Sequence, residues 1–175
     1  MKYYELIENG YDKRAGVLYA PSGWPCPLAV DTMEVNNWQN LRVELRDGKY
    51  CSFHECDAGA NMVSEELKDL LLSFIGENEN IEFLPVTATS KEYGNKTYYI
   101  MHFKIIYDVI DVKNTVYVPG TDIIIKVHID QEKAKGLKVF NSQPAVNDVI
   151  ISEDVYQAIK RNKLDIGLEF VLVGA

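Results

Sequence analysis

Two cysteines and a histidine near the end of the first third of the chain form the group with the most chemical potential. They read Cys51-x-x-His54-x-Cys56, and a third cysteine, Cys26, lies upstream. Thiolates and imidazoles bind zinc, but a structural zinc site needs about four such ligands, usually in two paired clusters. The sequence offers no second cluster. We therefore interpret Cys51, His54 and Cys56 as ordinary residues of a strand and expect no metal and no other cofactor.

The other residues capable of acid–base chemistry are dispersed. His102 and His128 fall in predicted strands, where a hydrogen-bonded structural histidine is the expected role. Asp108 and Asp111 are three residues apart, which points them to opposite faces of a strand. For each, a carboxylate bonded to backbone amides or to lysine is the better interpretation. The sequence also lacks a Gly-x-Ser-x-Gly elbow, a phosphate-binding glycine loop and a His-Glu-x-x-His helix. We expect no catalytic residue and no enzymatic activity.

Composition limits the class of partner. The net charge of −8 argues against a nucleic-acid binder, which needs a basic surface, and it suits a basic partner. The longest apolar runs, near residues 98–112, are too short and too charged to span a membrane. Three cysteines are an odd and sparse set that suggests reduced thiols, and the opening residues lack the apolar segment of a signal peptide. We expect a cytoplasmic protein with neither a nucleic-acid nor a membrane partner.

Three exposed-looking residues are the candidate partner-binding positions. Trp24 lies in a proline-rich loop and resembles the aromatic anchors that dominate protein interfaces, although it could equally cap a core. Glu77 and Glu79 lie in the polar loop 76–80, for which a solvated turn is the alternative interpretation.

A repeated phrase specifies the elements that hold these residues in place. Val63-Ser64-Glu65-Glu66-Leu67 and Ile151-Ser152-Glu153-Asp154-Val155 each predict a helix that begins after the serine, and each is followed by a buried strand. Ser64 and Ser152 are expected to cap these helices through their hydroxyl groups, at about 1 kcal/mol each. The two repeats extend over 61–88 and 149–175.

The remaining pattern predicts strands. Alternation at 41–45, followed by Asp47-Gly48, predicts a hairpin with 49–55. A strand is expected over 98–107, and strands at 115–118 and 123–129 flank a Pro119-Gly120 turn. The predicted fold is α+β, with two helices packed on a largely antiparallel, twisted sheet. We expect an N-terminal β-rich lobe over 1–60 and a domain over 61–175 that contains both repeats.

The chain from about residue 61 to 175 resembles a bacterial immunity-protein family, the Imm11-like group, which is found beside polymorphic toxins. The resemblance lies in both serine phrases and in the segments that follow them, 81–86 and 162–170, together with 98–100, 107–111 and 138–140. It implies a non-enzymatic protein that binds and neutralises a cognate toxin, and the acidic charge suits a basic toxin domain. The family supplies no catalytic set to transfer.

Two other functions remain open at the level of sequence. One is an enzyme or small-ligand-binding protein with a cleft between the N-terminal lobe and the repeat domain, where His102 and Asp108 would meet. The other is a homodimer or larger homo-oligomeric scaffold whose repeats need no other partner.

Overall fold

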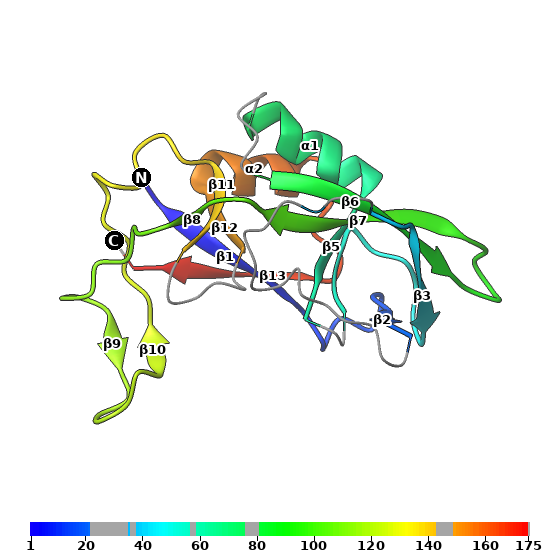
Figure 1. The fold of residues 1–175 in the computed structure, drawn as a ribbon, viewed down its shortest axis with the longest axis horizontal. Coiled ribbons are helices and arrows are strands. Elements are labelled where there is room, and N and C mark those ends of the chain that lie inside the picture. Colours follow the sequence, from blue (N-terminus) through cyan, green and yellow to red (C-terminus); the bar gives the residue numbers. More distant parts are fainter. Residues whose placement is uncertain (22–34, 36–37, 57–58, 76–80, 143–148, 175) are drawn as a thin grey trace.

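The computed structural model describes residues 1–21, 35, 38–56, 59–75, 81–142 and 149–174 and has the predicted α+β class (Figure 1). The helices are α1 (Glu65–Ile75) and α2 (Glu153–Arg161). The strands are β1 (Tyr3–Glu8), β2 (Val17–Tyr19), β3 (Leu41–Arg46), β4 (Phe53–Glu55), β5 (Asn61–Ser64), β6 (Ile81–Thr89), β7 (Lys96–Phe103), β8 (Ile106–Tyr107), β9 (Val116–Tyr117), β10 (Ile124–Lys126), β11 (Val139–Ser142), β12 (Val149–Ser152) and β13 (Leu168–Val173).

The strands form two larger sheets and one separate hairpin. One sheet has the order β13-β1-β12-β11-β8 and the other the order β2-β3-β6-β7-β5-β4, while β9 pairs with β10. Pairing is mostly antiparallel, with β3–β6 and β11–β8 parallel. The first sixty residues contribute strands to both sheets, because β1 lies between β13 and β12 and β3 lies beside β6.

The predicted helix–strand repeat is part of a strand–helix–strand unit that occurs once in each sheet. In the first unit β5, α1 and β6 follow one another, and β7 lies between the two strands, antiparallel to both. In the second unit β12, α2 and β13 follow one another, and β1 takes the middle place. The strand before each helix was not predicted, because it is only four residues long.

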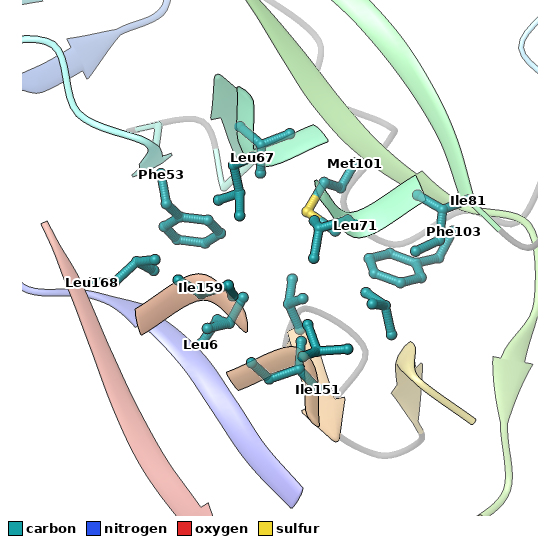
Figure 2. Close-up of a cluster of buried hydrophobic side chains, with 14 residues drawn as sticks. Leu6, Phe53, Leu67, Leu71, Ile81, Met101, Phe103, Ile151, Ile159 and Leu168 are labelled. Carbon is teal, nitrogen blue, oxygen red and sulfur yellow. The ribbon is translucent and has the colours of Figure 1, made fainter. Parts of the chain in front are cut away.

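The two units share one core. Each helix buries a stripe spaced by four residues, Leu67 and Leu71 in α1 and Val155 and Ile159 in α2, all with no measurable exposure. Figure 2 shows these stripes meeting side chains from both sheets. Complete burial of one such side chain contributes roughly 1.5–3 kcal/mol, so helix packing outweighs local helix propensity. The helices therefore join the two sheets into one structure.

Two further clusters complete the interior. One lies within the six-stranded sheet and gathers Leu18, Val43, Met62, Val86 and Tyr98. The other lies at the far end of the five-stranded sheet and gathers Tyr3, Ile110, Ile129, Phe140 and Val173.

The expected hairpin over 41–55 is wrong. The turn itself forms, with positive φ at Asp47 (52°) and Gly48 (72°). However, β3 pairs with β2 and β6, and β4 pairs with β5. Val43 and Leu45 of β3 are buried in the same cluster as residues of β2 and β6, so tertiary packing decides the pairing.

The long strand predicted over 98–107 is divided between the two sheets. It ends as β7 at Phe103, and the chain crosses past Ile105, which is 50% exposed, before forming β8 in the other sheet. The strands predicted around Pro119-Gly120 are confirmed as β9 and β10, with antiparallel pairing. Neither described helix has the length and apolarity needed to cross a membrane.

Candidate partner-binding surface

The β9–β10 hairpin extends away from the rest of the protein (Figure 1). It is apolar on the outside, since Ile123 and Ile125 are each 63% exposed and Val116 is 46% exposed. Val112, which precedes the hairpin, is also exposed. Large β-branched side chains gathered in solvent are costly, and their concentration on one element is typical of a contact surface.

The C-terminal part of β13 continues this apolar surface. Val171 and Leu172 are exposed there, and a groove of about 230 Å³ separates them from Ile124 and Ile125 of β10. We use the name hairpin surface for the six exposed apolar residues of this region, which are Val112, Val116, Ile123, Ile125, Val171 and Leu172.

Polar residues anchor the hairpin at its base. The Asp111 carboxylate accepts hydrogen bonds from the Asn114 side chain (2.6 Å) and from the Lys113 backbone amide (3.1 Å). The Asn114 side-chain bond is the main cause of a lowered pKa for Asp111. The hydroxyl of Thr115 accepts from the His128 amide at 3.1 Å, across the base. The hairpin is thus held in a defined position, and the predicted structural role of Asp111 is confirmed.

The turn at the tip is closed by main-chain bonds. The Val118 amide donates to the Ile123 carbonyl at 2.8 Å, and the Thr121 amide donates to the Val118 carbonyl at 3.1 Å. Gly120 has a φ of 77°, which glycine adopts without strain. An open depression lies over this turn and continues the surface to Val112.

The structure brings Cys51 and His54 together in the interior. The Cys51 sulfur lies 3.3 Å from Nε2 and 3.5 Å from Nδ1 of His54, and it donates to the Phe53 carbonyl at 2.9 Å. Burial raises the pKa of the Cys51 thiol to about 12. The thiolate is the nucleophilic form, so this cysteine is held in its inert form at neutral pH. Nδ1 of His54 faces Glu8 Oε1 at 3.5 Å, which makes the cluster a joint between β4 and β1.

Cys56 is buried in a different cluster, with 2% exposure. Among the residues that the structure describes, no group of three His, Cys, Asp or Glu side chains is arranged to hold a metal ion. Cys26 lies outside the described residues.

His102 and Asp108 do not meet in a cleft. His102 is fully buried in β7, whereas the Asp108 carboxylate is exposed and accepts a hydrogen bond from Lys133 at 3.0 Å. The predicted lysine-bonded role of Asp108 is confirmed.

The two predicted helix caps have different outcomes. The hydroxyl of Ser64 accepts from the Leu67 amide at 3.3 Å, which confirms the first cap. Ser152 occupies the cap position of α2, but its hydroxyl makes no cap bond and donates to the Asp154 carboxylate at 2.5 Å, so this prediction is wrong. Ser152 is fully buried, and the Lys138 carbonyl and Asp154 draw its hydroxyl away from the helix amides.

The partner-binding residues predicted from sequence were Trp24, Glu77 and Glu79, and all three lie outside the described residues. They remain predictions. The hairpin surface was missed, although its signal is visible in the run Ile123-Ile124-Ile125, because a short hairpin strand with apolar residues on both faces cannot bury them all.

Comparison with known families places most of the chain in one family profile. The profile described as the immunity protein family (Imm11) matches residues 40–175, which is most of the chain and includes both strand–helix–strand units. The match begins at the start of β3, inside the segment expected to form a separate N-terminal lobe. A comparison with curated proteins gives no match.

Proposed function

The chain belongs to the immunity protein family (Imm11), and from this membership we propose that it binds and neutralises a cognate bacterial toxin without catalysing a reaction. An immunity protein of this kind acts by contact, so it needs a rigid surface whose side chains are not buried in its own core. The observation that carries the proposal is the hairpin surface, a set of exposed apolar side chains on an anchored projection.

The exposure and position of these residues support a role in binding. Apolar residues at the centre of an interface supply most of its free energy once the partner excludes water from them. The net charge of −8 favours a basic toxin through long-range attraction, which mainly accelerates association. Both described cysteines are free thiols, which suits action in the reducing cytoplasm of the producing cell.

Co-expression with the cognate toxin tests the proposal. The wild-type protein should protect the cell and co-purify with the toxin. Ile125→Asp places a charge at the centre of the hairpin surface, and we expect it to abolish protection while the protein stays folded, because Ile125 is 63% exposed.

Leu72→Asp is the matched control. Leu72 is an apolar residue of α1 that is 40% exposed, and α1 lies on the opposite side of the molecule from the hairpin (Figure 1). This variant should protect as the wild type does. Cell death with soluble wild-type protein and no complex would refute the proposed function. Equal loss of protection in the two variants would instead show that the hairpin surface is not the toxin-binding surface.

A further inference from the structure

The outer edge of β13 presents main-chain groups without a partner among the described residues. Main-chain groups of successive strand residues point alternately to the two sides of the strand. Gly174, which follows β13, points away from β1, because its N–H donates to Val127 and its carbonyl accepts from Ile129, both at 2.9 Å. Because this orientation repeats every two residues, Leu172 and Phe170 must also point their N–H and C=O groups away from β1.

The bond pattern of β1 confirms this alternation. Lys2 accepts from Glu153 on the β12 side, and Asn9 donates to Gly167 on the other side. Odd-numbered residues of β1 therefore face β13, where the partners of Tyr3 and Glu5 are Val173 and Val171. On the open side of β13, no described residue makes a main-chain bond to Phe170 or Leu172.

The equivalent edge of the first unit is covered from Pro85 onward. Alignment of 81–86 with 168–173 places Pro85 at the position of Leu172. Proline has no N–H to satisfy, and the Pro85 carbonyl accepts from the Trp38 indole at 2.8 Å. From Val86 onward, β3 pairs with the same edge of β6. The first unit shows that the shared architecture allows the outer strand to have partners on this edge. The open edge of β13 is therefore a difference between the two units.

The space beside this edge has the shape and lining for an extended peptide. Residues 127–129 run alongside Gly174, and β10 then diverges from β13 (Figure 1). The groove of about 230 Å³ in this angle is lined by Ile124, Ile125 and Lys126 on one side and by Val171, Leu172 and Val173 on the other. Its volume is below the roughly 300–1,000 Å³ of small-molecule pockets, and it suits one or two apolar side chains of a chain segment.

We propose that the open edge of β13 accepts an extended segment of the toxin as an additional strand. This inference rests on the proposed function and names how the partner is held. The segment forms main-chain hydrogen bonds with Phe170 and Leu172, which gives affinity without regard to sequence. Its side chains supply specificity, with an apolar residue opposite Val171 and a basic residue opposite the exposed Glu169 on the same face.

A proline substitution distinguishes the contribution of the main-chain hydrogen bonds to toxin affinity from that of the side chain. Leu172→Pro removes the outward N–H and leaves the bonds to β1 in place, while Leu172→Ala removes the side chain but keeps the N–H. We expect Leu172→Pro to bind the toxin about tenfold more weakly than Leu172→Ala, because it loses a main-chain bond and crowds the added strand. Thermal unfolding of both variants checks that the fold is retained.

Hydrogen exchange on the wild-type protein gives an independent readout that needs no variant. On toxin binding, the exchange rates of the Phe170 and Leu172 amides should fall by about tenfold or more. The amides of Glu169 and Val171, which already face β1, should change little and serve as the internal control.

The outcomes distinguish the inference from its premise. Equal toxin binding by Leu172→Pro and Leu172→Ala, or unchanged exchange at Phe170 and Leu172 in the complex, overturns the added strand and leaves toxin binding intact. Absence of any complex with wild-type protein overturns the proposed function itself. Protection of 168–173 that increases with protein concentration, without toxin, assigns the edge to a second copy of the chain and overturns the inference.

Discussion

The two strand–helix–strand units have the same order of elements and differ at their outer strands. In the first unit β6 is flanked by β7 and β3, and its partner β7 follows it directly in the chain. In the second unit β13 is flanked on one side by β1, which comes from the opposite end of the chain. No described strand pairs with its other side. The same local pattern thus builds a strand whose outer edge is covered from Pro85 onward in one place and a strand with an open outer edge in the other.

The units differ in a second way, in the segment that adjoins the outer strand. Beside β6 lies β3, followed by β2, and their residues Val43 and Leu18 are buried in the second cluster. Beside the end of β13 lies the β9–β10 hairpin, whose apolar residues are exposed. The repeat is therefore a scaffold, and the proposed binding function belongs to what is added beside its second copy.

The largest expected effect tests whether the two units form one cooperative structure. Leu71→Ala in α1 and Ile159→Ala in α2 each remove a fully buried side chain from the shared core. Each variant should lower the free energy of unfolding by about 2–5 kcal/mol. Because the core is shared, denaturant unfolding should show a single transition in both variants. Two separated transitions would mean that the units fold independently.

The next effect sharpens the contrast between the two sides of β13. Val171→Pro removes an N–H that faces β1 and should lower the free energy of unfolding by about 1–3 kcal/mol. Leu172→Pro removes an N–H that faces outward and should lower it by less than about 1 kcal/mol. Denaturant titration of the two neighbouring variants provides the measurement. Equal losses would contradict the alternation on which the open edge depends.

A smaller effect separates the two serines. Ser64→Ala should lower the free energy of unfolding by about 1 kcal/mol, and Ser64→Asp should restore most of it, because aspartate also caps. Ser152→Ala acts through Asp154 instead. Its effect should therefore diminish in an Asp154→Ala background, whereas the Ser64→Ala effect should not. Additive behaviour of Ser152→Ala with Asp154→Ala would contradict this assignment.

The smallest effect concerns pH. Burial acts to raise the pKa of Asp154, but hydrogen bonds from Lys138 and Ser152 outweigh it and leave the pKa lowered. A carboxylate whose pKa is lower in the folded protein stabilises the fold above its unfolded pKa, which is about 3.9 for aspartate, and this stabilisation is lost as the pH falls.

Asp154→Asn and Lys138→Gln should both flatten the fall in stability as the pH decreases below about 5, measured by urea unfolding at each pH. Both remove the bond between Lys138 and Asp154, which is 2.5 Å long. An unchanged slope in both variants would show that this bond does not shift the titration. The first unit offers the comparison, because the Ser64 hydroxyl is the main cause of a lowered pKa at Glu66.

Much of the scaffold was predictable from the sequence because its determinants are local. The spacing of Leu67 and Leu71 and of Val155 and Ile159, each after a serine and two acidic residues, specifies the helices. Alternation predicted β3 and β7, and Pro119-Gly120 predicted the β9–β10 turn. The family resemblance also followed from these local phrases.

The candidate site was not predictable because it depends on which strands have neighbours. Leu172 and Pro85 occupy equivalent positions, and no property of the residue itself says that one edge is covered and the other open. Trp38 closes the first edge from 47 residues away in the chain, and Gly174 aligns β13 with residues 127–129. Such contacts follow from the assembled sheets.

The sequence by itself determined the two helices, the helix–strand repeat and the class of the fold, since side-chain periodicity acts within a few residues. The tertiary structure decided the pairing of β3, the role of Ser152 and the exposure of the hairpin surface. These depend on contacts between distant segments, whose free energy is set by the packing of the whole chain.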